Sequence, residues 1–259
     1  ILGDAGASAY TRSGAFQTDN AGYVVNSAGQ RLQAYSPTTA GTFNTTSLSD
    51  LRLVSGDSAP QATTSADVIF NLPSNVAVPT VAIFDPANNG SYNNSTSLTV
   101  YDSLGAAHTA SLYFVKTAVA NTWDTHLYVD GTAVGTATTL QYTNTGALAV
   151  PVTGKVTFPT YTPATGAAGM DLTVDYGSST QYGDSFGVTA VSQDGFTTGR
   201  LIGISVDPTG VVQARFTNGR SISLGQVAIA NFANPQGLQP LGNTNWSETF
   251  GSGQALHGQ

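Results

Sequence analysis

The sequence predicts an all-β protein with two domains, in which a discontinuous β core domain is interrupted by an inserted β-sandwich or β-barrel domain. Three observations support this fold class. Apolar and polar residues alternate with a period of two over most of the 259 residues, as in half-buried strands. No amphipathic helical stripe extends beyond about two turns. The chain also divides by charge into a middle part and two outer parts.

The middle of the chain contains the clearest strands. Four segments place apolar side chains on one face and mostly polar side chains on the other, which is the pattern of a strand with one buried face. These segments are residues 98–100, 110–114, 123–129 and 170–174.

Turn sequences separate these strands, because their residue types accept the positive φ of tight turns. They are Asp102-Ser103-Leu104-Gly105, Asp130-Gly131 and Asn144-Thr145-Gly146. Near the end of the chain, Asn218-Gly219 predicts a two-residue type I′ hairpin turn, in which both residues have φ above zero.

The two outer parts resemble each other. The run Asp-Asn-Ala-Gly-Tyr-Val-Val at 19–25 recurs in kind at 207–213 as Asp-Pro-Thr-Gly-Val-Val-Gln. A second turn follows each run, at Ala28-Gly29 and at Asn218-Gly219. Both runs predict β-hairpin modules, and their repetition indicates that the two ends of the chain fold together.

Charge marks the domain boundaries. All six arginines lie outside residues 59–178, whereas both lysines, Lys116 and Lys155, lie inside. The middle has seven acidic residues against these two lysines, so it carries −5 of the net −7. We therefore expect a core domain from residues 1–58 and 179–259 and an inserted outer domain at 59–178. The linkers at 55–64 and 176–181 are rich in Gly, Ser, Thr or Pro.

Composition excludes several classes of function. The net charge of −7, without a run of Lys or Arg, predicts no nucleic-acid partner. The chain has no cysteine, which excludes disulfides and thiolate chemistry. No apolar run reaches the roughly 18 residues of a membrane-spanning helix, so we expect no membrane insertion. Residues 1–9 lack the basic start of a signal peptide.

The residues that could carry chemistry do not form a recognisable site. His108, His126 and His257 are too far apart for a local metal motif, and no G-x-S-x-G sequence occurs. Glu248 is the only glutamate, and many aspartates belong to turn sequences rather than to a carboxylate pair. The Asp-x-x-Gly turns lack the alternating oxygen ligands of a calcium loop. We predict no catalytic, cofactor-binding or metal-binding residues, no cofactor and no enzyme activity.

Two stretches carry motifs that a known family shares. The motif residues are Tyr10, Thr11, Arg12, Gly14 and Phe16 in the first, and Asp194, Gly195, Gly225, Asn231, Phe232, Gly237 and Leu238 in the second. The first stretch is similar to the pattern Y-T-R-x-G-x-F-x-x-D-x-x-G-x-L-V-N of flagellar rod and hook proteins, with Val24 in place of the leucine of that pattern. The second, longer stretch resembles the flagellar hook protein family in particular. Residues 102–108 and 112–116 add a hook-like signature inside the insert.

This resemblance implies a core β domain built from both ends of the chain and an outer β domain built from the middle. Hook proteins also have N- and C-terminal helices that form the inner tube, so the chain is similar to the central part of a hook subunit. The resemblance further implies secretion through the flagellar type III export channel. The expected location is extracellular, in the basal body and hook of the bacterial flagellum.

The resemblance also implies a function and a set of partners. Hook subunits polymerise with copies of themselves into a curved flexible tube, a universal joint that transmits torque from rod to filament. The hook cap, the rod and the hook–filament junction proteins are the other implied partners. Two alternatives remain: a rod protein of the same family, and an extracellular adhesin or carbohydrate-binding β protein. The second would rely on exposed Tyr92, Trp123, Tyr161 and Trp246, of which Trp123 and Trp246 are expected in the core and in the motif region.

Arginines are the candidate subunit-interface residues. Guanidinium groups make planar contacts through several hydrogen bonds and are enriched at protein interfaces, where lysine is depleted. The alternative is that these arginines only cover solvated hairpins. The candidates are Arg12, Arg31, Arg200, Arg215 and Arg220, and we expect Lys116 and Lys155 of the insert to contribute little to assembly.

Overall fold

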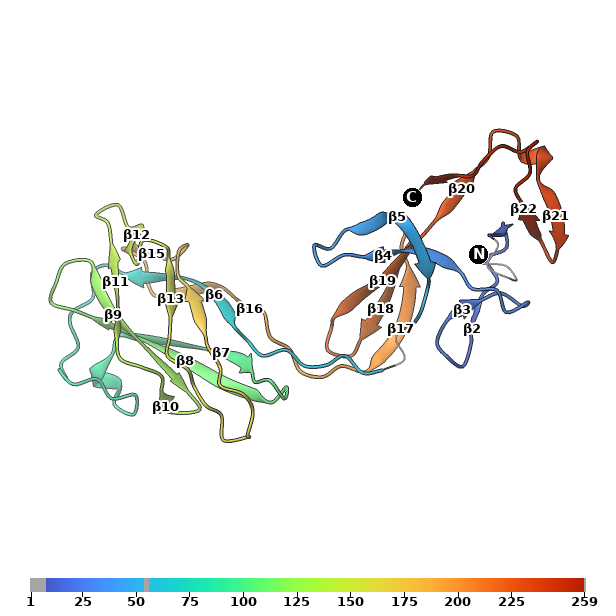
Figure 1. The fold of residues 1–259 in the computed structure, drawn as a ribbon. Coiled ribbons are helices and arrows are strands. Elements are labelled where there is room, and N and C mark those ends of the chain that lie inside the picture. The colour runs from blue at the N-terminus through green and yellow to red at the C-terminus, as the bar shows by residue number, and fades with distance from the viewer. Residues whose placement is uncertain (1–7, 54–55, 259) are drawn as a thin grey trace. The chain divides into compact units, whose positions relative to one another are not determined.

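The computed structural model describes residues 8–53 and 56–258, and it consists almost entirely of strands and turns (Figure 1). The chain forms two compact units. Unit 1 contains Ile1–Ser58 and Gly199–Gln259, and unit 2 contains Ala59–Thr198. The predicted all-β class, with a β domain inserted into a discontinuous β core, is confirmed.

Unit 2 ends later in the chain than charge and composition indicate. They place the end of the insert at residue 178, whereas the compact unit continues to Thr198. The reason is strand pairing: β15 (Thr180–Tyr182) and β16 (Gly187–Gln193) both pair with β6 (Ser65–Pro73). With residues 179–198 included, unit 2 has nine aspartates against two lysines, a formal charge of −7. Unit 1 has six acidic residues and six arginines and is formally neutral.

Unit 2 is built from two sheets. The first has the strand order β12-β11-β9-β8-β7, and β10 pairs with β9. The second has the order β13-β14-β6-β15, and β16 pairs with β6. The remaining bounds are β7 (Asn94–Tyr101), β8 (Ala107–Lys116), β9 (Thr122–Val129), β10 (Thr132–Ala133), β11 (Thr138–Tyr142), β12 (Leu148–Val150), β13 (Lys155–Thr157) and β14 (Thr173–Asp175), with a 3₁₀ turn at Asn89–Ser91.

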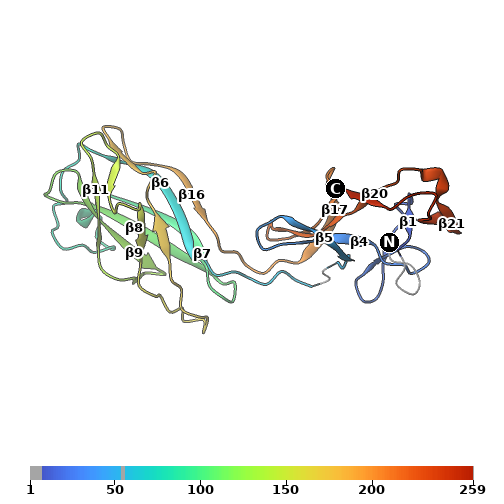
Figure 2. The ribbon, with the colours of Figure 1, turned by 45° about the horizontal axis from the view of Figure 1, so that its top comes forward.

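Strand β6 holds the second sheet together. It runs parallel to β14 and β15 and antiparallel to β16, which lies beside it in both views (Figures 1 and 2). Its alternate residues Val68, Phe70 and Leu72 are buried, as a strand with one core-facing side requires. The first strand of the insert therefore pairs with its last strand, which closes unit 2 on itself.

The core of unit 2 lies between its two sheets and draws large side chains from both. Trp123 is fully buried, and its indole N–H donates a hydrogen bond to the Gln181 side-chain oxygen at 2.9 Å. Such a cluster, with alternate strand residues pointing inward, is the packing of a β-sandwich. Its largest fully buried members are Trp123, Tyr176, Phe70, Phe114, Leu72, Leu112, Leu127 and Leu140.

The predicted strands of the insert are largely present. Residues 98–100, 110–114 and 123–129 lie in β7, β8 and β9. The segment 170–174 is shorter than predicted, because only Thr173–Asp175 pairs as β14. Met170 instead forms an isolated antiparallel bridge with Tyr161.

Unit 1 combines strands from both ends of the chain. Its main sheet has the order β17-β18-β19-β4-β5, so β19 from the second part pairs with β4 from the first. Smaller sheets are β1-β22-β21, β2-β3 and β20-β23. The bounds are β1 (Tyr10–Thr11), β2 (Gln17–Thr18), β3 (Val24–Val25), β4 (Gln33–Pro37), β5 (Phe43–Asp50), β17 (Leu201–Val206), β18 (Val211–Phe216), β19 (Ser221–Val227), β20 (Ile229–Asn231), β21 (Gln239–Gly242), β22 (Asn245–Ser247) and β23 (Leu256–Gly258), with a 3₁₀ turn at Pro235–Gly237.

The Asp-x-x-Gly sequences form the predicted turns in the same way at both ends of the chain. One carboxylate oxygen of Asp19 accepts hydrogen bonds from the backbone N–H groups of Ala21 and Tyr23. Asp207 does the same for Thr209 and Val211. Gly22 and Gly210 follow with φ of 87° and 80°, a conformation that glycine adopts without strain.

The predicted type I′ turn at Asn218-Gly219 is wrong. Gly219 has a φ of 80°, but Asn218 is not among the residues with positive φ. Phe216 and Arg220 close a three-residue loop, which is a type I turn followed by a left-handed glycine. Two consecutive residues with positive φ are found instead at Asp130 and Gly131, with 49° and 78°, in the connection between β9 and β10.

Candidate subunit interface

The segment that carries the opening motif joins the two ends of the chain. β1 pairs antiparallel with β22, so Tyr10 lies opposite Trp246 and Thr11 opposite Asn245. The Thr11 hydroxyl donates a hydrogen bond to the carbonyl oxygen of Thr244 at 3.0 Å. The motif strand therefore forms one edge of the β1-β22-β21 sheet.

Aromatic packing connects the two motifs. The Tyr10 and Phe232 rings meet edge to face, with their centroids 4.8 Å apart. The Tyr10 hydroxyl lies 3.4 Å from a carboxylate oxygen of Glu248. Burial and the charge of Glu248 raise the pKa of Tyr10, so the phenol stays protonated and donates. Residues from the two separate motif stretches thus contact each other directly.

Two cavities flank the motif strand. The larger, of about 490 Å³, is lined by residues including Gly14, Phe16, Leu48 and Ile229. The second, of about 250 Å³, includes Phe232, Leu238 and Trp246 in its lining.

Tyr10, Thr11 and Arg12 border both cavities. Arg12 is exposed. Within residues 8–53 and 56–258, its guanidinium has no hydrogen-bond or ion-pair partner.

Arg31 is placed differently, because its guanidinium is already engaged within unit 1. One terminal nitrogen lies 2.7 Å from a carboxylate oxygen of Asp50, and the group stacks over the Tyr23 ring at 3.9 Å. Burial raises the pKa of Asp50, but hydrogen bonds from Arg31 and Gln33 outweigh it and lower that pKa. Arg52 lies over the same ring at 5.6 Å.

The other three candidates gather at one end of the main sheet. Arg215, near the end of β18, lies in register with Gly203 and Ser221. Arg200 precedes β17 and is tied through its backbone to Thr217, while Arg220 closes the hairpin loop that begins at Phe216. All three are exposed. The structure thus brings Arg200, Arg215 and Arg220 together but leaves Arg12 and Arg31 apart from them, and their assignment to an interface stays a prediction.

Several motif residues serve the fold. The Asp194 carboxylate accepts hydrogen bonds from the backbone of Thr64 and Ser65 and from the Thr64 hydroxyl. Gly195 lies against Thr63, where an added Cβ would be 2.7 Å from the backbone nitrogen. These two residues fasten the end of the insert to its beginning.

Close packing against side chains at Gly225 and against backbone at Gly237 accounts for two further glycines. An added Cβ at Gly225 would lie 3.0 Å from Leu51, and one at Gly237 would lie 2.5 Å from the carbonyl carbon of Gly251. Gly14 is different, because an added Cβ would meet nothing within 4 Å and its φ is not positive. Among these motif glycines, Gly14 alone has no packing contact that explains it within the described residues.

Sequence reasoning missed the polar contact that links the ends of unit 1. The side-chain oxygen of Gln30 accepts hydrogen bonds from the amides of Asn26 at 2.8 Å and Asn245 at 2.7 Å. No local pattern predicts this pair, because Gln30 and Asn245 are 215 positions apart. Two other residues of the second motif line the smaller cavity: Asn231, at the end of β20, and Leu238.

Known chemical sites were also sought among the residues that the structure describes. No group of three or more His, Asp or Glu side chains there could hold a metal ion. No helix in the described part of the chain is long and apolar enough to cross a membrane. What the geometry offers is therefore a surface of exposed arginines, cavities and apolar edges.

Comparison with known proteins finds similarity to one family. The model described as "Flagellar hook protein FlgE/F/G D1 domain" matches residues 1–100, and that described as "Flagellar basal body protein FlaE D2 domain" matches residues 71–196. The flagellar hook protein FlgE of Escherichia coli is 34% identical over 259 residues, which cover 96% of this chain and 63% of that protein. The chain is therefore similar to flagellar hook proteins over nearly its whole length.

Other hook proteins show the same similarity. FlgE of Salmonella typhimurium is 33% identical over 96% of this chain and 63% of its own length, and FlgE of Borreliella burgdorferi is 30% identical over 96% and 62%. The crystal structure of Helicobacter pylori flagellar hook protein FlgE2 superposes with a TM-score of 0.68 over 95% of this chain and 87% of that chain. At 14% identity this match shows a shared fold. The chain spans somewhat less than two thirds of the length of these FlgE relatives.

Proposed function

We propose that this chain is the central, surface-forming part of a structural subunit of the bacterial flagellar hook. Copies of the subunit polymerise into a curved flexible tube that transmits torque from rod to filament, outside the cell. The observation that carries the proposal is the similarity to hook proteins across 96% of the chain. The role requires no catalysis and no cofactor.

Such a joint needs firm domains and contacts that can be remade. Only 9% of residues are charged, which limits the number of ion pairs that could lock neighbouring subunits together. Ser, Ala and Gly side chains lose little rotamer freedom when a contact forms. These features support a surface whose contacts change without a large energetic barrier.

Arg12, Arg200, Arg215, Arg220 and, to a smaller extent, Arg31 are the proposed interface residues of unit 1. Arg12 supports this most directly, because it is exposed beside two cavities and has no partner among the described residues. The hook cap, the rod and the hook–filament junction proteins are the proposed partners beyond other copies of the chain.

The alternatives are less well supported. A rod protein would share the opening motif but would not account for unit 2, a whole inserted domain. A carbohydrate-binding surface would need exposed aromatic rings, whereas Trp123 is fully buried and Tyr92, Tyr161 and Trp246 are half-buried.

Complementation tests the proposed function. The full-length protein is produced in a motile bacterium that lacks its own hook subunit, and the cell envelope is examined by electron microscopy. Short curved tubes of this subunit, with restored swimming, are the expected result. Straight rods continuous with the basal body would favour the rod alternative, and a protein found only on the general cell surface would favour an adhesin.

A further inference from the structure

Unit 2 contains a buried histidine held between two carboxylates. The His108 side chain is 5% exposed and Asp102 is fully buried, whereas Asp130 is 44% exposed. The His108 Nε2 lies 3.1 Å from Asp102 Oδ2, and its Nδ1 lies 2.6 Å from Asp130 Oδ2. We call these three residues the histidine clamp, and its role is independent of the proposed hook function.

The geometry requires a doubly protonated imidazole. A neutral imidazole has one N–H and one lone pair, so one carboxylate oxygen would face a nitrogen lone pair at hydrogen-bond distance. Burial lowers the pKa of His108, but the hydrogen bonds and charges of Asp130 and Asp102 outweigh it and raise that pKa. Among the residues that the structure describes, the Tyr161 ring also lies against His108, with 6.1 Å between the ring centroids. Burial and the charge of Asp130 raise the pKa of Tyr161, so it stays neutral.

Each carboxylate of the clamp also organises backbone. Asp102 Oδ1 accepts hydrogen bonds from the N–H groups of Leu104 and Ala106, both at 2.9 Å. Asp130 Oδ1 accepts one from the Thr109 N–H at 2.9 Å.

A further side chain completes the shell around Asp102. The Thr165 hydroxyl donates to Asp102 Oδ2 at 2.7 Å. The clamp thereby joins three connections of unit 2, at 102–106, 130–131 and 160–169.

The 102–106 turn supports the two chain segments that connect unit 2 to the rest of the protein. Gly105, with φ of 83°, lies so close to them that an added Cβ would be 2.8 Å from Pro60 and 3.3 Å from the Cα of Thr197. The same two segments are paired through the bridge between Gln61 and Phe196. The chain enters and leaves unit 2 directly beside these residues, since the unit begins at 59 and ends at 198.

We propose that the histidine clamp is a pH-sensitive support for the entry and exit segments of unit 2. With His108 protonated, its ring links Asp102, which holds the 102–106 turn next to Pro60 and Thr197, to Asp130 and through it to the Thr109 backbone. When His108 loses a proton, one of its two hydrogen bonds to the carboxylates is lost and the turn is held less firmly. In an extracellular protein, the order of these connecting segments then follows the pH of the surroundings.

The direction of the pH effect follows from linkage. Because the folded protein raises the pKa of His108, its contribution to stability is fully present below the unfolded value of about 6.5. It is lost as the pH rises through the folded pKa. On the acid side, burial raises the pKa of Asp102, but hydrogen bonds from Thr165, His108 and the turn backbone outweigh it and lower it to about 2. That contribution is present above about pH 4 and is lost as the pH falls towards 2.

Nuclear magnetic resonance on the whole 259-residue chain tests the proposal. The His108 ring is titrated together with amide exchange from pH 5 to 9, expressed as protection factors. We expect both ring N–H groups on His108 below its transition and a pKa above 6.5. We expect protection of the Ala106, Gln61 and Phe196 amides to fall by up to tenfold for each pH unit between about 6.5 and the pKa of His108 in the folded protein, and to level off above that pKa. Titration of His108 at or below the usual value, or unchanged protection at Gln61 and Phe196 across its titration, would overturn the proposal.

Three variants sharpen the test. Asp130→Asn removes the more exposed carboxylate and should shift the release of the entry and exit segments to lower pH. His108→Gln should make their protection independent of pH between 6 and 9. His126→Gln is the matched control. The His126 ring stacks on Phe84, with 3.8 Å between the ring centroids, and is not part of the clamp, so its loss should leave the transition unchanged. If His108→Gln fails to fold, an unshifted transition in Asp130→Asn still refutes the clamp.

Discussion

The two units of this protein bury their apolar residues to different extents. Unit 2 has one continuous cluster of 21 buried apolar side chains drawn from both of its sheets. The main cluster of unit 1 has four, Val24, Ala34, Leu51 and Val212. Unit 2 also holds the whole net charge, whereas unit 1 is neutral and holds every arginine.

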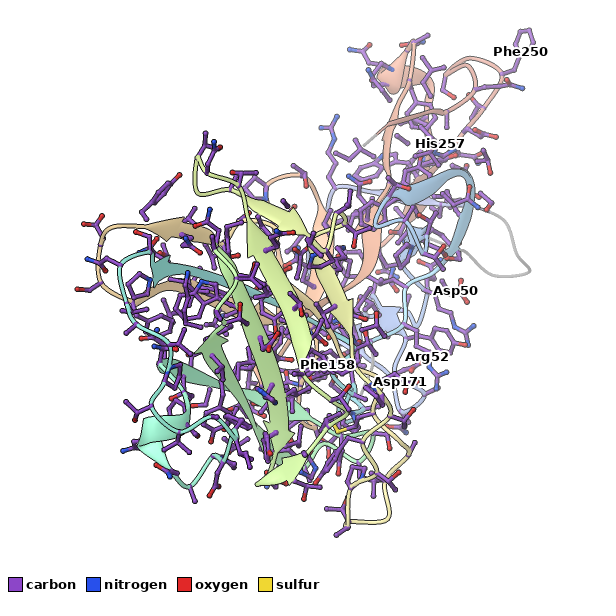
Figure 3. The ribbon with its side chains drawn as sticks, turned by 90° about the vertical axis from the view of Figure 1, so that its left-hand side faces the viewer. Asp50, Arg52, Phe158, Asp171, Phe250 and His257 are labelled. Carbon is purple, nitrogen blue, oxygen red and sulfur yellow. The ribbon has the colours of Figure 1, made fainter. Side chains whose placement is uncertain are left out.

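Unit 1 exposes several apolar side chains along one strand edge. The edge strand β17 exposes Ile202, Ile204 and Val206 by 62%, 40% and 61%, and Phe250 is fully exposed at a loop in the last part of the chain (Figure 3). A strand edge of this kind, without lysine or proline, offers backbone groups and apolar side chains to another molecule. Unit 2 also exposes apolar side chains, among them Ile83 at 82% and Val152 at 93%. The two units therefore differ in the size of their buried cores and in the apolar edge of β17, not in the total number of exposed apolar side chains.

The largest expected effect lies in the core of unit 2. Trp123→Ala removes a fully buried ring and its hydrogen bond to Gln181, and should cost about 3–5 kcal/mol of unfolding free energy. Urea unfolding followed by circular dichroism measures it. Trp246→Ala, at a half-buried site in unit 1, is the control and should cost clearly less. Equal losses would contradict the difference between the two cores.

Glycine packing gives the next largest effect. Gly195→Ala would force a Cβ to within 2.7 Å of the Thr63 nitrogen, so we expect a loss of about 1–3 kcal/mol. Gly14→Ala should leave stability unchanged, because its Cβ enters open space. Thermal unfolding of both variants decides this. If Gly14→Ala also impairs hook formation in the full-length protein, Gly14 faces a neighbouring subunit.

Part of the fold could be predicted from sequence because it depends on local signals. Alternation predicts β7, β8 and β9, and Asp102 and Asp207 mark turns through side-chain hydrogen bonds to nearby backbone. The second domain boundary could not be predicted, since it depends on the pairing of β16 with β6 across more than 100 residues. The histidine clamp could not be predicted for the same reason: His108 and Asp130 are 22 positions apart, and no local pattern connects them.

Turn type was predictable only where the loop length was fixed. Asp130-Gly131 has two positive φ values because its strands leave room for two residues, and Val129 pairs with Thr132. At Asn218-Gly219 the strands leave three residues, so only the glycine is left-handed. The uneven distribution of arginine along the sequence identifies the interface candidates. Only the structure shows that Arg31 is already paired with Asp50.

The third prediction concerns assembly and separates the two units by charge. In the full-length protein, Arg12→Ala and Arg220→Ala should lower hook formation or motility, while thermal stability changes by less than about 1 kcal/mol, as is usual for surface residues. Arg31→Ala should lower hook formation and also thermal stability somewhat, because this variant loses the ion pair with Asp50.

Lys155→Ala is the matched control for these arginines. The Lys155 side chain is 57% exposed, and its ion pair is long, with 3.6 Å between its Nζ and Asp175 Oδ2. Lys116, which sequence alone places beside it as a control, is buried and lies over Trp123 at 4.9 Å, so Lys116→Ala should reduce stability. Loss of hooks in Lys155→Ala, with all three arginine variants silent, would contradict the assignment of unit 1 as the main assembly surface.

The smallest expected effect is on the association of the 259-residue chain by itself. We expect a monomer in dilute solution, because the remaining part of the hook-protein length lies outside this chain and cannot contribute contacts. Light scattering after size exclusion at micromolar concentration measures it. The exposed edge of β17 opposes this expectation, and Ile204→Lys tests that edge by placing a charge on it. A stable oligomer would refute the prediction, and its loss in Ile204→Lys would show that the β17 edge is needed to bring two copies together.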